Sequence, residues 1–289
     1  MDEHTWLAEH FEAERSRLLA VAYRMLGSRS EAEDAVQEAW LRLSGAAHDE
    51  VDNLAAWLTT VVGRIALNML RSRKTRSETH VPEPLIDPAD GTSPEHAALL
   101  ANGIGLALLV VLETLAPAER VAFVLHDIFG LPFEQIAPVV ERTPDAARQL
   151  ASRARRRVQA RHATPDTDIA AQRSLVEAFC AAAENGDFDR LVAVLAPDVL
   201  LRVDAGAPAG GFVEVRGADQ VARRAQAFSR AGFVRHVALV NGAPGLVTTL
   251  DGKPFSVMAF SMQNGKIAQL DIVRDAARLA ELDLSAFDS

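Results

Sequence analysis

One stretch, LPFEQIAPVVERTPDAARQLASRARRRV at residues 131–158, decides the fold of the middle of the chain. Its first part has the length and apolar content of a short helix, and Glu141-Arg142 forms a turn. Thr143 followed by Pro144 has the chemistry of an N-cap followed by the first helical position. We therefore expect a second helix to begin there and to continue past Val158.

This second helix separates its side chains by chemistry. At 100° per residue, one face carries the apolar residues Ala147, Leu150, Ala151, Ala154 and Val158, and polar residues lie opposite. The outward residues are Asp145, Gln149, Ser152 and Arg156, with Arg148 and Arg153 beside them. Amide, hydroxyl and guanidinium groups hydrogen-bond base edges and phosphates in the major groove. The stretch therefore predicts a DNA-binding helix-turn-helix.

Composition and charge narrow the class of protein. The chain has 289 residues, 49% apolar and 24% charged, with a net charge of -9, as expected of a globular protein of about two domains. Its single cysteine, Cys180, excludes an intrachain disulfide framework and a Cys-rich zinc site, and we expect no metal and no cofactor. The acidic N-terminus lacks a secretory signal, and no apolar run approaches the ~20 residues of a membrane span. A cytoplasmic protein without a membrane contact is expected.

Positive charge is concentrated in two stripes of this acidic chain. Arg71, Arg73, Lys74 and Arg76 lie within six positions, and seven arginines between residues 142 and 161 face a single acid. Net acidity argues against general coating of nucleic acid, which depends on Lys and Arg. The two basic stripes instead favour binding of nucleic acid at two defined segments of the chain.

Breaker residues divide the chain into segments. Residues 1–76 are expected to form helices, and residues 77–95, which hold four prolines, a linker. Residues 96–161 contain further helices and the helix-turn-helix. Residues 168–289 begin with helices and end in four short apolar strands.

Two-residue turns separate those strands. The pairs are Asn241-Gly242, Asp251-Gly252 and Asn264-Gly265, all of which favour hairpins. Helices followed by an antiparallel meander indicate an α+β domain with a curved sheet.

A helix within the first segment carries an acidic face. The capping-box sequence at Ser30–Glu33 predicts that it begins there and continues to about Leu43. Its apolar residues form one buried stripe. The residues of another face are Asp34, Gln37, Glu38 and Leu41. An acidic surface with one exposed leucine is therefore expected.

These segments resemble a known family. LAVAYRMLG at residues 19–27 and EAEDAVQEAWLR at residues 31–42 resemble regions 2.1 and 2.2 of extracytoplasmic-function (ECF) sigma factors. Residues 57–76 resemble regions 2.3 and 2.4. RVAFVLHD at residues 120–127 and the helix-turn-helix resemble region 4. Residues 168–289 resemble the SnoaL-like, ketosteroid-isomerase-like cone that one ECF subgroup carries.

The resemblance implies two all-α sigma domains followed by an α+β cone, and a factor that directs core RNA polymerase to promoter DNA. The acidic face would bind the β′ clamp helices, and region 4 the β flap. The residues implied at the –10 element are Arg64, Asn68, Arg71, Arg73, Lys74 and Arg76. Those implied at the –35 element are Thr143, Arg148, Gln149, Ser152, Arg153 and Arg156.

The chain departs from the family pattern at several positions. Glu141 stands where the turn usually has Gly, and a non-Gly residue at positive φ costs about 1 kcal/mol, so a rearranged turn is expected. Pro138 falls inside the preceding short helix and predicts a kink. The linker keeps Pro82-Glu83-Pro84 of a subgroup motif without its Trp-Leu. The cone's usual loop appears only as Asp204-Ala205-Gly206-Ala207, and a second signature is not recognisable at residues 273–278.

For the cone we favour a role as a docking module for the sigma domains. We expect it to pack near the Pro82–Pro84 linker and to set the spacing between the two DNA-reading domains. A separate anti-sigma protein is then unnecessary. Asp204 and Asp271 are the candidate regulatory residues of the cone. A ligand-sensing pocket and residual acid–base catalysis are the alternatives, the latter by Asp204, His236, Asp251 or Asp271.

A ligand-responsive helix-turn-helix regulator is a further alternative for the whole chain. It leaves the acidic helix and the first basic stripe without a role. Cys180 is expected to be a buried core thiol rather than a redox sensor.

Overall fold

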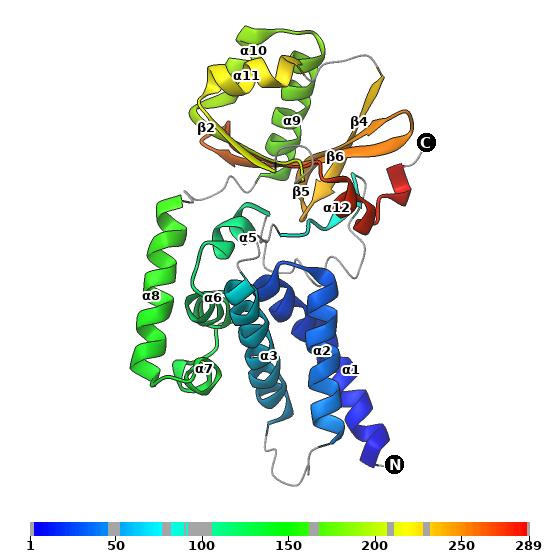
Figure 1. Ribbon diagram of the computed structural model, residues 1–289. Helices are drawn as coiled ribbons and strands as arrows, with labels where there is room; N and C mark the ends of the chain where they lie inside the picture. The colour runs from blue at the N-terminus through cyan, green and yellow to red at the C-terminus, as the bar shows by residue number, and fades with distance from the viewer. Residues whose placement is uncertain are drawn as a thin grey trace. The chain divides into compact units, whose positions relative to one another are not determined.

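The computed structural model describes residues 3–45, 53–76, 82–89, 91, 106–161, 168–206, 211–227 and 232–287. The described residues form two compact units: a helical unit up to Glu83 and over 108–161, and an α/β unit that includes Pro84 to Gly91 and everything from Asp168 onward. Figure 1 labels the elements of both units. Within the described ranges, no helix combines the length and the hydropathy needed to cross a membrane.

Three helices begin the helical unit: α1 (Glu3–Leu26), α2 (Arg29–Ser44) and α3 (Leu54–Arg76). The hydroxyl of Ser28 caps α2 by accepting the Glu31 N–H at 3.4 Å, so the cap lies two residues before the expected Ser30. The buried side of α2 carries the apolar stripe that its periodicity predicts, including Val36 and Leu43. Its opposite side is consequently free to carry charge.

The second half of the helical unit contains the helix-turn-helix. It comprises α5 (Leu106–Glu113), α6 (Pro117–Phe123), the π-helical segment η2 (Val124–Ile128), α7 (Phe133–Val140) and α8 (Pro144–Arg161). The Thr143 hydroxyl accepts the Ala146 N–H at 3.3 Å, which confirms the predicted N-cap. Ala147, Ala151 and Ala154 are buried, as expected from the period of α8.

The turn between α7 and α8 keeps the left-handed conformation that glycine usually supplies. Glu141 adopts φ 57° and ψ 46°, and its N–H donates to the Ala137 carbonyl. The expected rearrangement of this turn is therefore wrong, since a non-glycine residue adopts the same backbone geometry. The helix also continues through Pro138 to Val140.

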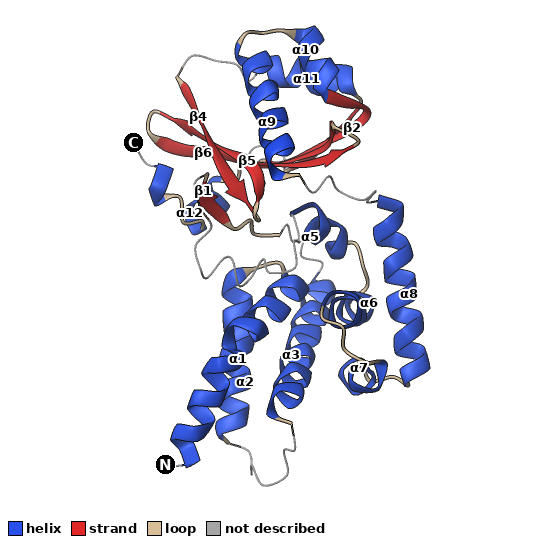
Figure 2. Cartoon of the chain, turned by 180° about the vertical axis from the view of Figure 1, so that it is seen from behind, coloured by secondary structure: helices blue, strands red, loops and turns tan. Residues whose placement is uncertain are grey.

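The α/β unit is a curved sheet with α9 (Ile169–Glu184), α10 (Phe188–Val194) and α11 (Ala218–Ala227) on one face and α12 (Ala276–Glu281) on the other side (Figure 2). The 3-10 turn η4 (Ser285–Phe287) follows α12. The strands of the unit are β1 (Ile86–Pro88), β2 (Leu195–Asp204), β3 (Phe212–Arg216), β4 (Phe233–Val240), β5 (Ala243–Leu250), β6 (Lys253–Gln263) and β7 (Lys266–Val273). Their order in the sheet is β1-β4-β5-β6-β7-β2-β3.

The predicted hairpins form the meander β4 to β7. Asn241, Asp251 and Asn264 each have φ between 51° and 53°, and each is followed by a glycine of positive φ. These are the backbone angles that a two-residue hairpin turn requires, and they explain the Asn-Gly and Asp-Gly pairs.

The sheet differs from the expected antiparallel one at one place: β2 pairs with β7 in parallel. β2 and β7 are far apart along the chain, so no hairpin turn forces them to run in opposite directions. Strand β1 was not predicted: it lies in the expected linker and pairs with β4.

Candidate nucleic-acid interface

The predicted acidic face on α2 is present and exposed. Asp34, Gln37, Glu38 and Leu41 are all solvent-exposed, and the Leu41 side chain retains 62% of its accessible surface. Glu38 forms an ion pair with Arg42 one turn further along. An exposed leucine among carboxylates is a feature of surfaces that bind a partner through both charge and apolar contact.

The residues predicted at the –10 element differ in their exposure to solvent. Arg64, Asn68 and Lys74 are exposed on α3, and Arg71 is partly exposed. The side chain of Arg76 lies outside the described part of the chain. The exposed residues recur at three- and four-residue spacing, so they lie along one side of the helix.

Arg73 does not belong to that exposed side. Its guanidinium lies inside the helical unit, where Nε donates to Glu31 Oε1 at 3.1 Å and Nη1 donates to the Leu26 carbonyl at 2.8 Å. Its side chain is only 7% exposed. This geometry does not support the predicted DNA contact, because the guanidinium ties α3 to the ends of α1 and α2.

Two of the exposed arginines contact the helix-turn-helix. Arg64 Nε and Nη2 both donate to the Pro138 carbonyl at 3.2 Å. Arg71 donates twice to Glu141 Oε2, at 3.1 and 3.2 Å. The sequence gives no signal for these contacts, since the partners are about 70 residues apart.

The predicted reading face of α8 is exposed, with Thr143, Arg148, Gln149, Arg153 and Arg156 at the surface and Ser152 partly so. Arg148 donates to Asp145 at 2.6 Å, and its guanidinium carbon lies 5.1 Å from the centroid of the Phe133 ring. Within the described part of the chain, Arg156 pairs with no carboxylate.

Other arginines of α8 bind acids of the preceding helices. Glu119, whose side chain is 8% exposed, contacts Arg153 at 3.2 Å and Arg157 at 2.7 Å. Arg155 binds Asp127 at 2.6 Å. These contacts hold α8 against α6 and η2, so part of the second stripe stabilises the helix-turn-helix. Glu119 and Asp127 were missed in the sequence, where each is a single acid without a motif.

The linker residues are held within both units. In the helical unit, Glu83 accepts the Tyr23 hydroxyl at its carbonyl (2.7 Å), donates its N–H to the Gly27 carbonyl (2.6 Å) and accepts the Arg29 N–H at its carboxylate (2.9 Å). Pro82 and Pro84 beside it are buried. In the α/β unit, Leu85 and Asn241 exchange two hydrogen bonds of 2.8 Å.

The two cone segments that lack the family signatures are bound to one another. Asp204 Oδ2 accepts from Arg278 Nη1 at 2.5 Å, and the Asp204 carbonyl accepts the Arg274 N–H at 2.7 Å. A Cβ on Gly206 would lie 2.5 Å from Asp275 Oδ2, so only glycine allows this close approach.

Asp271 is buried on β7. Its Oδ2 accepts from Gln269 Nε2 at 2.7 Å, and it lies opposite Arg202 in the β2–β7 register. Burial raises the pKa of Asp271 to about 6.

The acid–base candidates do not converge on a cavity. His236 lies near Thr249, and Asp251 occupies the β5–β6 turn. No contact joins these two residues, Asp204 and Asp271 among the described residues. The space between the sheet and its helices is filled by apolar side chains such as Phe179, Leu191 and Phe260.

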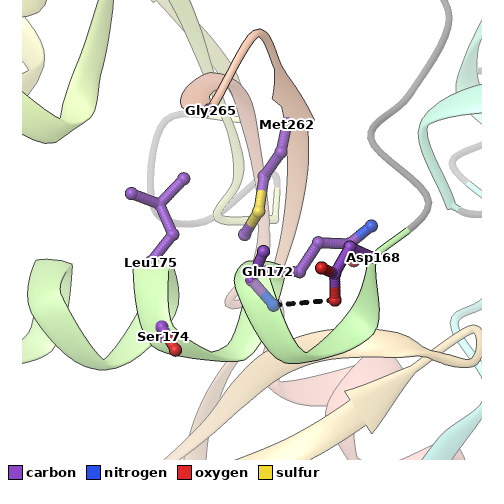
Figure 3. Close-up of a pocket in the computed structure, with 7 residues that line it drawn as sticks. Asp168, Gln172, Ser174, Leu175, Met262 and Gly265 are labelled. Carbon is purple, nitrogen blue, oxygen red and sulfur yellow. Dashed lines mark hydrogen bonds between the residues drawn. The ribbon is translucent and has the colours of Figure 1, made fainter.

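A pocket opens at the start of α9 (Figure 3). Its lining is Asp168, Ala171, Gln172, Ser174, Leu175, Met262 and Gly265. The Asp168 carboxylate caps α9 by accepting the N–H groups of Ala170 and Ala171 at 2.9 and 3.1 Å. The one ionisable group of this lining is thus already used by the helix. Cys180, on the same helix, is half-buried against the apolar core and not fully buried as expected, and this burial raises the pKa of its thiol to about 11.

Comparisons with family models, related sequences and solved structures all match this chain to sigma factors. The model of Sigma-70 region 2 matches residues 10–76, and that of Sigma-70, region 4 matches residues 105–158. The chain is 41% identical over 278 residues to the ECF RNA polymerase sigma factor SigJ of Mycobacterium tuberculosis, covering 90% of this chain and 89% of that protein. It is 35% identical over 289 residues to the probable ECF RNA polymerase sigma factor SigI of the same organism, covering 98% of each. The crystal structure of M. tuberculosis SigJ superposes with a TM-score of 0.76 at 36% identity, covering 96% of this chain and 99% of that one.

Proposed function

The chain belongs to the extracytoplasmic-function RNA polymerase sigma factors, and from that premise we propose how its surfaces divide the work of promoter recognition. Its partners are core RNA polymerase and promoter DNA. The observation that carries the proposal is the separation of charge on the helical unit. An acidic face on α2 and a basic side of α3 lie on different helices, beside an arginine-rich reading face on α8. A cytoplasmic location follows from these partners.

Asp34, Gln37, Glu38 and Leu41 form the polymerase-docking face. Carboxylates complement a basic coiled coil such as the β′ clamp helices, and electrostatic complementarity accelerates association. Leu41 supplies the apolar contact that an exposed charge pair alone lacks. The β flap is the corresponding partner of region 4.

At the –10 element, Arg64, Asn68, Arg71 and Lys74 contact the opened strand, with Arg76 at the end of α3. Guanidinium and ammonium groups along one side of a helix can follow a phosphate backbone. Arg73 acts here through structure, because its guanidinium is bound to Glu31 and Leu26.

At the –35 element, Arg148, Gln149, Ser152 and Arg156 face the major groove from α8, with Thr143 at its start. Arginine and glutamine pair bidentately with guanine and adenine, and each such pair is worth about 1–3 kcal/mol of discrimination. Arg153 contacts Glu119, which orients it along the flank of α8.

The cone regulates in cis and does not catalyse. Its interior is apolar, and its acidic residues are engaged in turns, ion pairs and strand contacts. The linker strand β1 belongs to its sheet, so a change in the cone can act on the connection between the two sigma domains. No separate anti-sigma protein is required for such control. Asp204 and Asp271 remain the candidate regulatory residues.

Transcription in vitro tests the docking face. Promoters are first selected from a randomised DNA library with core polymerase and the full chain. The variant Leu41→Asp is expected to lower transcript yield at least about fivefold, because an exposed anchor at an interface centre costs more than about 1 kcal/mol when removed. Glu12→Lys on α1, likewise exposed, is the surface control and should retain activity. Equal yields for wild type and Leu41→Asp would contradict the assignment.

Two matched turn variants test regulation by the cone. Asn241→Gly keeps the left-handed backbone but removes the amide that accepts the Leu85 N–H. Asn264→Gly makes the same change in the β6–β7 turn. We expect only Asn241→Gly to alter the preferred spacing between promoter elements. Wild-type spacing preference in both variants would mean that the contact with the linker has no regulatory role.

The same experiments separate a sigma factor from a ligand-responsive regulator. A sigma factor gives promoter-specific transcripts only with core polymerase. Nanomolar binding to one duplex sequence, without stimulation of core polymerase, would instead identify a regulator that acts alone.

A further inference from the structure

Arg148 makes a contact that joins the two helices of the helix-turn-helix. It lies in the second turn of α8, near the end that follows α7 (Figure 1). Its guanidinium carbon lies 5.1 Å from the centroid of the Phe133 ring, at the start of α7. A guanidinium within about 6 Å of a ring centroid is attracted by the quadrupole of the ring. Phe133 is therefore a direct partner of an arginine on the predicted reading face.

A second contact fixes the same guanidinium from within α8. Arg148 Nη1 donates to Asp145 Oδ1 at 2.6 Å, one turn earlier in the helix. Nε and Nη2 of Arg148 make no hydrogen bond among the described residues. The guanidinium edge formed by Nε and Nη2 thus keeps two donors. Two donors are what a bidentate contact with O6 and N7 of guanine requires.

The Phe133 ring is itself fixed by the segment before α7. The His126 ring, on the π-helical segment η2, lies 4.0 Å from the Phe133 ring between centroids, with 31° between the planes. His126 Nδ1 donates to the Leu131 carbonyl at 2.9 Å, and the Leu131 N–H donates to the Leu125 carbonyl at the same distance. These bonds hold the start of α7 against η2, so the ring that contacts Arg148 has a defined position.

Fixing an arginine before DNA binds affects how well it distinguishes bases. The Arg148 side chain is 56% exposed, and a long exposed side chain that is ordered only on binding loses rotamer freedom at that moment. A guanidinium that moves freely can also tilt to suit bases other than guanine. The contacts with Phe133 and Asp145 reduce both effects, because they restrict the guanidinium before DNA arrives.

We infer that Phe133 is a positioning residue for –35 recognition. Its ring and the Asp145 carboxylate hold the Arg148 guanidinium in the orientation that contacts a guanine, and His126 holds the ring. Phe133 thereby sets the base preference at one position of the –35 element through Arg148. The inference rests on the proposed –35 role of Arg148.

Promoter selection with core polymerase and the full chain tests the inference. The –35 region of the template is randomised, and sequencing of the transcripts' templates gives the base preference at each position. Arg148→Ala identifies the position at which the preference for guanine is lost. Phe133→Leu keeps an apolar side chain but removes the ring. It is expected to lower the guanine preference at that same position about two- to fivefold, the range of an exposed cation–π contact.

Two further substitutions separate positioning from a general effect on folding. Phe133→Tyr keeps an aromatic ring and should retain the wild-type preference. Phe129→Leu is the matched control, because Phe129 is likewise half-buried but its ring contacts Arg24 and not α8. It should also retain the wild-type preference. In the Arg148→Ala background, Phe133→Leu should cause no further change at the position that Arg148 contacts.

Three results would overturn the inference. They are an unchanged preference in Phe133→Leu, an equal loss of preference at every position, and an effect of Phe133→Leu that persists in the Arg148→Ala background. Failure of the proposed –35 role is distinguishable, because Arg148→Ala would then keep the wild-type preference at every position. That result would overturn the inference together with the role on which it rests.

A charge variant keeps the inference testable if Phe133→Leu does not fold. Asp145→Asn weakens the second contact of Arg148 at a side chain that is 85% exposed. Glu134→Gln, at an exposed glutamate in the first turn of α7, is the control, since both variants lose one negative charge. We expect only Asp145→Asn to reduce the guanine preference at the position that Arg148 contacts, by up to about fivefold. Equal base preferences in the two variants would overturn the inference.

Discussion

Replacing Arg73 by alanine is expected to unfold the helical unit at lower denaturant, not merely to weaken DNA binding. The guanidinium forms an ion pair with Glu31 and donates to the Leu26 carbonyl at 2.8 Å, at the end of α1. Alanine removes both contacts at once. The Glu31 carboxylate and the Leu26 carbonyl then lose the donor that joins three helices.

The structure sets the size of this effect. Removing one partner of a buried ion pair costs about 3–5 kcal/mol. The Glu31 side chain is 30% exposed, so water can hydrate the remaining carboxylate in part. The expected loss is therefore near the lower end, about 3 kcal/mol. With a urea m-value of about 1.5 kcal/mol/M, the unfolding midpoint falls by about 2 M.

Tryptophan fluorescence during urea unfolding measures this loss selectively. The three tryptophans, Trp6, Trp40 and Trp57, lie on α1, α2 and α3, so their emission reports the helical unit. Lys74→Ala is the control, because the neighbouring lysine is exposed and its removal should change stability by less than about 0.5 kcal/mol. A wild-type midpoint for Arg73→Ala, together with weaker single-strand binding, would refute the reasoning from burial and restore Arg73 as a DNA contact.

Three further predictions concern the α/β unit. Burial raises the pKa of Asp271 from 3.8 to about 6, so the folded state binds the carboxyl proton more tightly than the unfolded state does. The folded state therefore loses stability as the pH rises from 3.8 to about 6. Asp271→Asn should therefore stabilise the unit by up to about 3 kcal/mol above pH 6 and by less near pH 4. Hydrogen exchange of the β7 amides measures this gain, and an equal gain at both pH values would contradict the prediction. The Cys180 thiol, with its pKa raised by burial to about 11, should react with Ellman's reagent at pH 8 about 100-fold more slowly in the native chain than in urea, and similar rates would contradict its burial. Gly245→Ala places a Cβ 2.7 Å from the Met258 carbonyl and 2.5 Å from Val240 Cγ2, so protection of β4 to β6 should fall by about 1–3 kcal/mol; unchanged protection would show that the strands adjust freely.

Features that depend on neighbouring residues were predicted well from the sequence. The Thr143-Pro144 start of α8 and the three hairpin turns each need only a few adjacent residues to specify their backbone. The acidic face of α2 follows from a period of 3.6 residues over four turns. Local geometry carries this information, so no knowledge of the tertiary contacts is needed.

Features that depend on distant partners were missed or misjudged. Ile86 pairs with Val240 across more than 150 residues, and no pattern in the Pro-rich segment indicates a strand. Arg73 looks like its neighbours in the basic stripe, yet the Glu31 carboxylate and the Leu26 carbonyl hold it inside the helical unit. Charge along a sequence does not reveal which side of a helix will be buried.

The sequence by itself predicted a sigma factor with two helical sigma domains and an α+β cone, because those properties depend on local motifs and helical periodicity. Only the tertiary structure decided which arginines are available. Arg73 became a structural contact, and Arg64 and Arg71 met the end of α7, because burial and partner choice arise when helices distant in sequence pack together. Glu141 illustrates both contributions. The sequence identifies it as a departure from the family pattern, but only the tertiary structure identifies Arg71 as the arginine that it binds.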